Sequence, residues 1–465
     1  MTDIAPTTRL AADAAAALSE ALDDRVVFPD HPTYPQAAMP WNLAVPQQPA
    51  AVVDVRDAED VVTAVRVARQ HGLAVSAQPV GHGATQALSG VVLLRTAGLD
   101  SIDVDLDIGV ARVGAGVTWG QLLPALDGTG RIAMAGSNPS VSVVGLMLGG
   151  GMSWFGRRYG ISARTLRSVR LVDGKGTLRH VDDSTDPDLM WALRGGGGEY
   201  GIVVEAEIAL LDEAVIVGGK LLYPIEVALP VLTAFLDVNR TAPDTFTCWA
   251  SLMHFPDVEF LPEPLRGQSF VNLDMTLLGS IDELETVIAP LRAAGPVVHD
   301  TVGEVPIGSL GQVADEPTDP SPSMEYAAFL TDVTNDTVRR IVDVAGDRTS
   351  TALFMVEIRP LGGAFATPSD VPAAIDQAVG DYAVVALGMP MVPELVEPIL
   401  GSQKALEASL AHEAAGGGHG SLTFHTADKP IDEVYSSQTL DRLRAVKART
   451  DPDGVIRGNH PIGAS

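Results

Sequence analysis

The chain has 465 residues, of which 46% are hydrophobic and 19% are charged. Length alone predicts about two to three domains, and this composition excludes a disordered or low-complexity protein. The formal net charge is −28, and such a charge repels nucleic-acid phosphates and anionic lipid head groups. We therefore expect neither nucleic acid nor a membrane surface as a partner.

Cysteine content and apolar runs bear on where the protein works. Cys248 is the only cysteine, which excludes an intrachain disulfide and a cysteine-rich metal site. Residues 1–4 lack a basic flank, and acidic residues interrupt the alanine-rich run 10–22. This pattern predicts a short amphipathic helix and neither a signal peptide nor a membrane span. Because no other apolar run reaches bilayer length, we expect a cytoplasmic protein.

Short β-branched runs alternate with helical stretches and glycine turns between residues 50 and 211. Segment 58–71 has valines at helical spacing, which predicts an amphipathic helix, and Gly72 caps it. Strands are predicted around it at 51–55, 73–76, 91–94, 102–106 and 110–113. This mixture of many short strands with helices indicates an α+β block.

A block of different character begins near Glu213. Its alternation predicts an antiparallel sheet with helices, namely strands 215–222, 245–252 and 269–277 and helices 227–240 and 281–294. Proline and acidic residues crowd 256–264 and 314–322, which predicts loops over a cleft. After the glycines 416–418 we expect a strand at 421–425, a helix at 431–449 and a tail at 451–462.

One histidine stands in a glycine-bounded loop, Pro79-Val80-Gly81-His82-Gly83-Ala84. Glycine on both sides lets the backbone approach a phosphate-bearing cofactor closely and leaves the imidazole ring free to react with it. We therefore interpret His82 as the attachment point of a flavin. An exposed loop histidine is the alternative, which the motifs further along the chain disfavour.

The segment 196–201 matches the dinucleotide fingerprint G-x-G-x-x-G. That motif requires a strand before the glycines and a helix after them, so that the pyrophosphate meets a helix N-terminus. Here a predicted helix, 187–193, comes first and a predicted strand, 202–208, follows. The reversed order disfavours a Rossmann fold and favours a tight turn beside a nucleotide.

A second glycine cluster occupies 145–151 and follows the polar turn 136–140. Successive glycine N–H groups can surround phosphate oxygens, because no Cβ blocks their approach. A helix-breaking turn explains the cluster equally well. Since it contains no lysine, an ATP-type phosphate loop is unsupported.

Several stretches together, in their order and spacing, resemble the FAD-binding oxidoreductases of the vanillyl-alcohol oxidase and p-cresol methylhydroxylase (PCMH) type. The resemblance is to the branch that includes berberine bridge enzyme and 6-hydroxy-D-nicotine oxidase. It covers 40–212 closely and the last forty residues more loosely. The matching stretches are 81–83, 114–119, 136–151, 157–160, 186–198 and 451–460.

The resemblance implies an α+β fold in which both chain ends, 1–212 and 415–465, form an FAD-binding domain of the PCMH type. A substrate domain at 213–414, with an antiparallel sheet covered by helices, is inserted between them. The implied FAD-binding residues are Pro79, Val80, Gly81, His82, Gly83, Ala84, Gly136, Ser137, Asn138, Val141, Gly145, Gly149, Gly150, Gly151, Gly201, Val203 and Asn459.

His82 aligns with the histidine that family members join to the flavin 8α-methyl carbon. Many relatives add a second, cysteinyl bond in the turn before the glycine triplet, where this chain has Asn138. The resemblance therefore implies FAD that is covalently bound through His82 alone. Such a bond raises the reduction potential of the ring and prevents loss of the cofactor.

The family's usual catalytic tyrosine has no counterpart here, because the segment 421–425 contains none. The catalytic candidates are His425, at the end of this predicted strand, and Glu357, in the substrate domain. Glu357 shares a strand face with Arg359, so a surface salt bridge between them is an equal alternative. The other candidates for a base are Tyr326, Tyr382 and His254.

Two further groups of side chains give weaker indications of function. His412, His419 and His425 lie close in sequence, but glycines interrupt them and no partner has metal-ligand spacing, so we expect no metal site. A set of aromatic residues could bind an aromatic or polyketide-like substrate, and the same residues would equally suit the hydrophobic core. They are Trp249, His254, Phe255, Phe329 and Phe354.

The predicted function is that of an FAD-dependent oxidoreductase, an oxidase that removes hydride from an alcohol or amine C–H of a small organic molecule. A secondary metabolite and a sugar are the candidate substrates, and O₂ is the expected electron acceptor. Two alternatives stay open at this point. One is a dehydrogenase with another acceptor, and the other is a flavoprotein that only binds its ligand.

Overall fold

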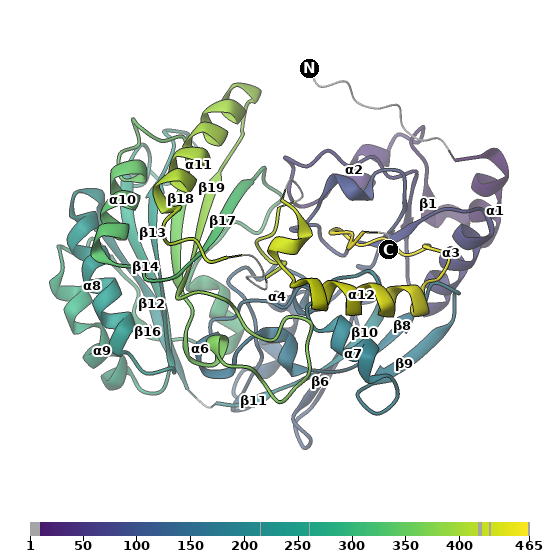
Figure 1. The fold of residues 1–465 in the computed structure, drawn as a ribbon, viewed down its shortest axis with the longest axis horizontal. Coiled ribbons are helices and arrows are strands. Elements are labelled where there is room, and N and C mark those ends of the chain that lie inside the picture. The colour runs from purple at the N-terminus through teal and green to yellow at the C-terminus, as the bar shows by residue number, and fades with distance from the viewer. Residues whose placement is uncertain (1–9, 214, 260, 417–420, 427–428, 464–465) are drawn as a thin grey trace.

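The computed structural model describes residues 10–213, 215–259, 261–416, 421–426 and 429–463. The structure has two halves that lie side by side (Figure 1). One half contains the N-terminal part of the chain and the C-terminal helix, and the other contains a large antiparallel sheet covered by helices. The α+β expectation is therefore confirmed.

The first half contains a small sheet in the order β1-β2-β4-β3, in which β4 pairs in parallel with β2 and β3. Helix α3 begins where the Asp57 carboxylate accepts hydrogen bonds from the N–H groups of Glu59 and Asp60. Its valine face is buried in the core. The elements are α1 (Ala12–Leu22), β1 (Val26–Val27), α2 (Tyr34–Ala38), β2 (Ala51–Asp54), α3 (Ala58–Gln70), β3 (Val75–Ala77) and β4 (Val92–Arg95).

A five-stranded antiparallel sheet in the order β5-β6-β10-β8-β9 completes this half. Its strands are β5 (Ile102–Asp105), β6 (Val110–Gly114), β8 (Leu166–Val172), β9 (Leu178–Asp182) and β10 (Ile202–Ala209). The short strands β7 (Arg131–Ile132) and β11 (Leu211–Asp212) pair separately. The helices are α4 (Trp119–Leu122), α5 (Val143–Leu148), α6 (Gly156–Tyr159), α7 (Pro187–Leu193) and α12 (Ser437–Thr450).

The second half is an eight-stranded antiparallel sheet in the order β15-β12-β14-β13-β18-β19-β17, with β16 paired to β12. Its strands are β12 (Ile216–Pro224), β13 (Phe246–His254), β14 (Ser269–Leu278), β15 (His299–Asp300), β16 (Gly303–Glu304), β17 (Met324–Leu330), β18 (Met355–Pro360) and β19 (Tyr382–Gly388). Helices α8 (Ala228–Thr241), α9 (Ile281–Ala293), α10 (Asn335–Ala345) and α11 (Val396–Leu410) cover the outer face.

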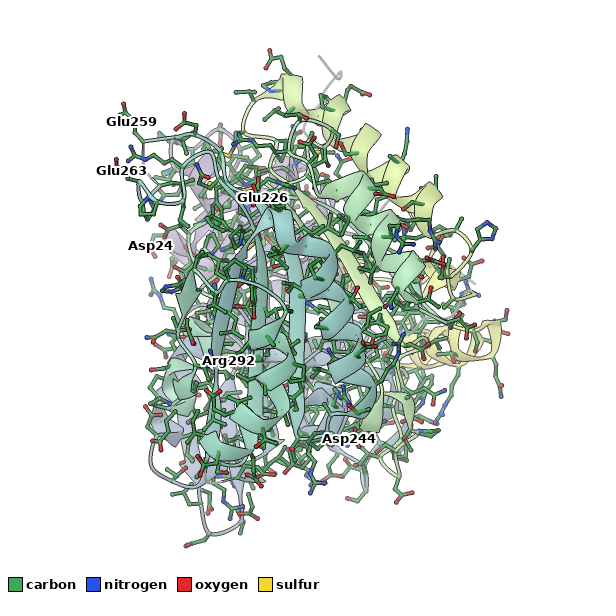
Figure 2. The ribbon with its side chains drawn as sticks, turned by 90° about the vertical axis from the view of Figure 1, so that its left-hand side faces the viewer. Asp24, Glu226, Asp244, Glu259, Glu263 and Arg292 are labelled. Atoms are coloured by element: carbon green, nitrogen blue, oxygen red, sulfur yellow. The ribbon has the colours of Figure 1, made fainter. Side chains whose placement is uncertain are left out.

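Strand alternation separates the two faces of this sheet. Leu221, Leu273 and Ala250 belong to the core under the helices, and so does Cys248. Their neighbours in sequence point to the other face, toward the first half. The helices carry charged groups on the outside, where Arg292 pairs with Glu285 and Asp300 (Figure 2).

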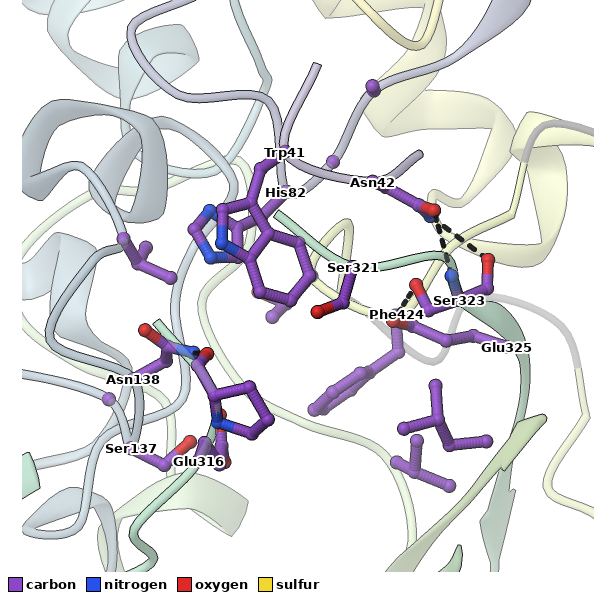
Figure 3. A pocket seen from close by; sticks show the side chains of 18 of the residues that line it. Trp41, Asn42, His82, Ser137, Asn138, Glu316, Ser321, Ser323, Glu325 and Phe424 are labelled. Atoms are coloured by element: carbon purple, nitrogen blue, oxygen red, sulfur yellow. Dashed lines mark hydrogen bonds between the residues drawn. The ribbon is translucent and has the colours of Figure 1, made fainter. Parts of the chain in front are cut away.

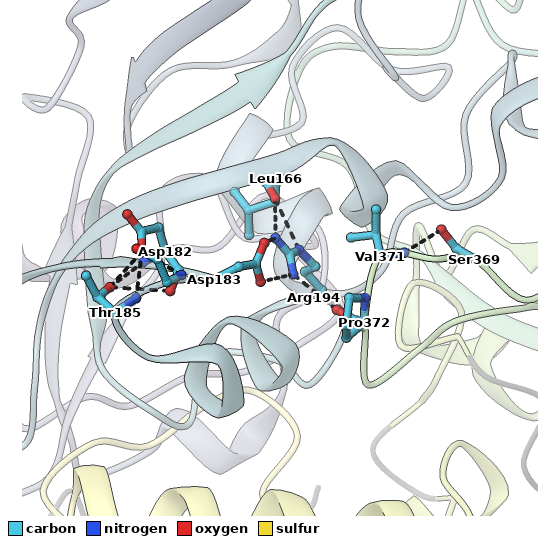
Figure 4. Close-up of polar contacts among 9 residues, drawn as sticks. Leu166, Asp182, Asp183, Thr185, Arg194, Ser369, Val371 and Pro372 are labelled. Atoms are coloured by element: carbon cyan, nitrogen blue, oxygen red, sulfur yellow. Dashed lines mark hydrogen bonds and ion pairs between the residues drawn. The ribbon is translucent and has the colours of Figure 1, made fainter.

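Buried Arg194 ties the two halves together (Figure 4). Its guanidinium donates to the backbone carbonyls of Leu166 in β8 and Pro372 in the loop after β18, and it forms an ion pair with Asp183. A second contact stacks Trp154 on Trp249 with ring centroids 3.7 Å apart. These contacts fix the sheet of the second half against the first half.

Most predicted elements lie within two residues of the observed ones, but two predictions at the C-terminal end are wrong. The segment 421–425 forms a turn, in which His425 N–H donates to Leu422 O, and no strand. Leu422 packs instead on Gly149 and Gly197 of the first half, so the chain is crossing between the halves here. The helix predicted at 431–449 is interrupted, since Ser436 caps a separate helix, α12.

Within the described residues, no helix is both long and apolar enough to cross a membrane.

Candidate functional site

A cavity of about 2400 Å³ lies between the two halves. This is larger than the roughly 300–1,000 Å³ of a typical small-molecule site, so it has room for a cofactor and a substrate. The first half supplies what we call the Gly-rich wall, the cavity-lining residues within 76–87, 136–149 and 197–203. The second half supplies the sheet wall, the cavity-lining residues of β12, β13, β14, β17, β18 and β19.

Nearly all the residues that the sequence suggested for cofactor binding line this cavity. Gly150 and Gly151 do not: they face a separate small void near Ile161 and Ile375. A Cβ at Gly151 would stand 2.9 Å from Leu146 and Ser162 atoms, so its role is packing. Those that do line it are Pro79, Val80, Gly81, His82, Gly83, Ala84, Gly136, Ser137, Asn138, Val141, Gly145, Gly149, Gly201, Val203 and Asn459.

The two glycines beside His82 serve different purposes. Gly81 has a φ of +106°, and a Cβ there would stand 2.9 Å from the Pro40 Cβ and 3.0 Å from the Trp41 nitrogen. Only glycine adopts this backbone without strain. A Cβ at Gly83 would meet no heavy atom within 4 Å, and the same holds at Gly198. These two positions leave open space on the cavity side, as close contact with a ligand requires.

His82 lies under Trp41, with the ring centroids 4.2 Å apart and the planes 17° from parallel (Figure 3). Its Nε2 contacts Ser140 Oγ at 3.2 Å. Its Nδ1 is buried and has no hydrogen-bond partner in the described part of the chain. Burial lowers the pKa of His82 to about 4. The ring is therefore neutral at physiological pH, with one nitrogen unused by the protein.

The loop 313–323 spans from the sheet wall to this histidine. The Trp41 indole N–H donates to Thr318 O at 3.0 Å, and the Asn138 amide donates to Pro317 O at 2.9 Å. The Asn42 side chain both donates to Ser323 O and accepts from its N–H. This loop, predicted from its prolines and acidic residues, holds Trp41 in place over His82.

The C-terminal segment returns to the Gly-rich wall. Residues 455–457 hydrogen-bond along Val75 of β3, and Thr85 donates to Asn459 O at 2.6 Å. Lys447 anchors the segment, because its ammonium donates to Glu199 O and Asp451 Oδ2, each at 2.7 Å. Asn459 thereby reaches the cavity, although it is far in sequence from the other lining residues.

The sheet wall carries a row of polar side chains that the sequence analysis missed. The register of the strands aligns Lys220, Asp274 and Trp249 across β12, β14 and β13. Lys220 Nζ lies 3.7 Å from Asp274 Oδ1, and Asn272 donates to Asp274 Oδ2 at 2.7 Å. Burial raises the pKa of Asp274 to about 8, and this lysine opposes the shift. The i, i+2 spacing of Asn272 and Asp274 in an apolar strand was the available signal.

Glu357 and Arg359 line the next part of the sheet wall. They form an ion pair, as their shared strand face suggested, but the pair is buried and not on the surface. Burial raises the pKa of Glu357, and Arg359 opposes this shift. The guanidinium lies 3.8 Å from the Trp249 ring centroid and 5.2 Å from that of Phe424. Glu357 thus sits in a rigid setting that faces the cavity.

His425 also lines the cavity, from the turn after the second half and not from a strand. Its ring lies 5.2 Å from that of His460 in an edge-on arrangement. Burial lowers the pKa of His460 to about 4, and His425 adds to this effect. The structure therefore brings both catalytic candidates, His425 and Glu357, to one cavity.

The other candidates for a catalytic base are less well placed to act on a substrate in the cavity. Tyr326 and Tyr382 are part of the core under the helices and do not line the cavity. His254 does, but both ring nitrogens are engaged, with Ser269 Oγ at 2.8 Å and Ala345 O at 2.7 Å.

Of the predicted aromatic set, Phe255 and Phe354 line the cavity with His254, whereas Trp249 and Phe329 do not. Phe255 packs edge-on against Phe270 and Phe354, with centroids 6.0 and 5.6 Å apart. Several further apolar side chains line the same cavity, namely Val258, Leu261, Leu265, Met389, Met391 and Leu395. The cavity therefore has an apolar lining in addition to the polar side chains of the sheet wall.

In the part of the chain that the structure describes, no group of three or more His, Cys, Asp or Glu residues could hold a metal ion. His419, one of the three histidines considered above, lies outside the described residues, as do Gly417 and Gly418.

Comparisons with known proteins agree with this architecture. A family model described as the FAD binding domain matches residues 49–182. The (R)-6-hydroxynicotine oxidase of Paenarthrobacter nicotinovorans is 27% identical across 95% of this chain and 97% of its own length. Residues 49–182 therefore match an FAD binding domain, and the chain as a whole resembles the PCMH-type FAD-binding oxidoreductases.

Solved structures share the fold of this chain. A BBE-like protein of Physcomitrella patens superposes with a TM-score of 0.83 at 19% identity, covering 97% of this chain and 99% of its own. A chitooligosaccharide oxidase gives a TM-score of 0.80, also at 19% identity and with the same coverage.

The site fits FAD on two observations of the structure. The buried Nδ1 of His82 has no partner in the described residues, and the backbone at Gly83 and Gly198 is open toward the cavity. The Gly-rich wall also offers little side-chain bulk along the cavity. This wall would therefore hold the cofactor, and the sheet wall would face the substrate.

Proposed function

We propose that this protein is an FAD-dependent oxidase that holds its cofactor through His82 alone. The observation that carries the proposal is the buried Nδ1 of the neutral His82 ring, which has no hydrogen-bond partner among the described residues and lies on the wall of a cavity that continues to the sheet wall. Asn138, at the place of a second attachment in relatives, is itself engaged with Pro317 and Ser140. It offers no nucleophile for a second bond.

The proposed reaction removes hydride from a C–H bond next to an alcohol or amine. Bound FAD would supply the hydride acceptor, and O₂ would then accept the two electrons and be reduced to H₂O₂. Glu357 or His425 would accept the proton from the substrate O–H or N–H, since both line the cavity. Arg359 holds the Glu357 carboxylate in place for this step.

The two kinds of lining in the cavity indicate the substrate class. Asp274, Glu357 and Glu325 line the cavity with polar groups, and Phe255 and Phe354 line it with apolar surface. A small organic molecule with a hydroxyl or amine at one end and an apolar or aromatic portion at the other fits both. This favours a secondary metabolite over a simple sugar as the substrate.

Attachment is tested first. Acid-precipitated protein should stay yellow, and peptide mass mapping should find the flavin on the peptide that contains His82. His82→Ala should abolish the adduct, whereas His180→Ala, at an exposed histidine of β9, should keep it. A colourless pellet from fully loaded protein would refute covalent binding.

The electron acceptor is tested separately. After anaerobic photoreduction, exposure to air should reoxidise an oxidase within seconds. Slow reoxidation in air together with fast reoxidation by a dye would identify a dehydrogenase. A loaded protein without turnover on a broad panel of alcohols and amines would favour the ligand-binding alternative.

A further inference from the structure

The side chain of Asn138 has a fixed orientation. The backbone N–H of Ser140 can only donate, and it lies 2.9 Å from Asn138 Oδ1. The backbone carbonyl of Pro317 can only accept, and it lies 2.9 Å from Asn138 Nδ2. These two backbone groups therefore assign the amide oxygen and nitrogen without ambiguity.

This orientation sets the direction of the next two hydrogen bonds. Ser140 Oγ lies 2.6 Å from Asn138 Oδ1, and because that oxygen only accepts, the hydroxyl must donate to it. The hydroxyl has one proton, so its contact with His82 Nε2 at 3.2 Å requires the ring to donate. His82 thus carries its proton on Nε2, and Nδ1 keeps a free lone pair.

We propose that Asn138 and Ser140 are a positioning pair that selects the attachment-competent tautomer of His82, with Nδ1 as the nucleophile toward the flavin. Trp41 completes the arrangement by holding the plane of the ring. The inference rests on the proposed function, because it concerns the covalent bond at His82. It adds a role for Asn138, which stands where relatives make a second bond.

Attachment of His82 to the flavin would be a two-electron oxidation with O₂ as the oxidant. One C–N bond forms between Nδ1 and the 8α-methyl carbon of the flavin. One C–H bond of that methyl group and the Nε2–H bond break, and the two protons and two electrons pass to O₂, which becomes H₂O₂. Nε2 is then an acceptor, so the Ser140 hydroxyl turns from Asn138 to donate to His82.

The pair predicts a non-additive pattern among three variants. In Asn138→Ala the Ser140 hydroxyl loses its acceptor and donates to Nε2 instead, which places the ring proton on Nδ1 and blocks it. In Ser140→Ala no hydroxyl is left to bias the ring this way. The double variant Asn138→Ala/Ser140→Ala also lacks that hydroxyl, although it loses the same contact with Pro317 as Asn138→Ala does. It therefore separates the tautomer effect from the loss of that contact.

The first readout is the rate of attachment. Full-length protein from a riboflavin-starved host is mixed with FAD, and covalent flavin is followed by fluorescence of the denatured band. Asn138→Ala should attach FAD about tenfold more slowly than the parent, which corresponds to one hydrogen bond. The double variant should recover to within about threefold of the parent. A double variant as slow as Asn138→Ala would overturn the proposal.

The second readout is the tautomer itself. With 8-nor-FAD, which lacks the methyl carbon, the assembled site forms without attachment, and ¹⁵N NMR of labelled histidine reports both ring nitrogens of His82. The parent should show a protonated Nε2, and Asn138→Ala a protonated Nδ1. A parent with the proton on Nδ1 would refute the inference. Failure of the parent to attach FAD at all would instead refute the proposed function, while the NMR result would still decide the tautomer.

Discussion

The Gly-rich wall and the sheet wall face the same cavity but are built in opposite ways. The Gly-rich wall consists of turns, small residues and backbone groups, and His82 and Asn138 are among its few functional side chains. The sheet wall consists of side chains that alternate along strands and meet across them, such as Asp274, Lys220 and Glu357. One wall thus depends on backbone shape, and the other on strand register.

The difference predicts how each wall responds to substitution. A change in the Gly-rich wall should affect cofactor loading and stability, because the backbone there has little freedom. A change in the sheet wall should affect reaction rate or pH dependence and leave loading intact. The four predictions below test this division.

The largest expected effect is on the sheet wall. Glu357→Gln should slow flavin reduction by about 10²–10⁴-fold, the usual loss for a positioned base, with little change in substrate binding. Because burial raises the pKa of Glu357, reduction by the parent should speed up with pH through an ionisation above the ordinary glutamate range. Stopped-flow measurements across pH provide the check once a substrate is known.

His425→Ala is the companion variant in that experiment. If it alone is slow, the proton acceptor is His425 and Glu357 only positions Arg359. If both variants reduce the flavin at the parent rate, neither residue is the base.

The second prediction concerns the anchor of the C-terminal segment. Lys447→Met leaves the buried carboxylates of Asp451 and Glu199 without their cation, and removing one partner of such a pair costs about 3–5 kcal/mol. The urea midpoint and the flavin content should both fall. Lys404→Met, at an exposed lysine of α11, should change neither. Normal loading in the Lys447 variant would mean that the segment does not support the Gly-rich wall.

The third prediction compares the two glycines that flank His82. Gly81→Ala forces a side chain into a left-handed backbone against Pro40 and Trp41 and should cost about 1–3 kcal/mol of stability. Gly83→Ala meets no neighbour in the protein, so stability should change by less than about 0.5 kcal/mol. Because Gly83 lines the cavity, the added methyl group should nevertheless lower FAD loading. Equal stability losses in the two variants would contradict this distinction.

The smallest expected effect is a pH dependence that originates in Asp274. Its folded-state pKa is raised to about 8 from 3.8, so its favourable contribution is complete below pH 4 and is lost as the pH rises through 8. Asp274→Asn should therefore lose less stability than the parent between pH 5 and 8. We expect a difference in Tm of about 2–4 °C.

Asp100→Asn, at an exposed aspartate, is the matched control and should follow the parent at both pH values. A parent Tm that does not change between pH 5 and 8 would argue that Lys220 keeps Asp274 charged throughout.

The sequence was informative about the Gly-rich wall for a physical reason. Turns with positive φ favour glycine, as at Gly81 with a φ of +106°, and such residues can be recognised in the sequence without knowledge of distant contacts. The reason that sequence could not separate cavity-lining glycines from packing glycines is also physical. Gly150 and Gly151 look like Gly149 in the sequence, but helix α5 ends beside them and turns them away from the cavity.

The sheet wall could not be assembled from the sequence, because which residues share a row depends on the pairing of strands that are distant in the chain. Asp274 meets Lys220 only through the register of β14 on β12. Trp41 was missed for a similar reason, since its stacking on His82 depends on a loop more than 270 residues later, at Thr318. His425 was predicted to lie on a strand, but the structure has a turn there. Five residues of mixed polarity are compatible with either, so the pattern could not distinguish them.

The pairing of residues 455–457 with β3 has a consequence for the order in which the two halves fold during synthesis. Domains fold largely as they leave the ribosome, from the N-terminus onward, yet Val75 cannot gain its last strand-like neighbour until residues 455–457 have emerged. The second half can fold first, while the Gly-rich wall waits for its final segment. Under the proposed covalent binding, the yellow colour of the protein would therefore mark chains that have been translated past residues 455–457.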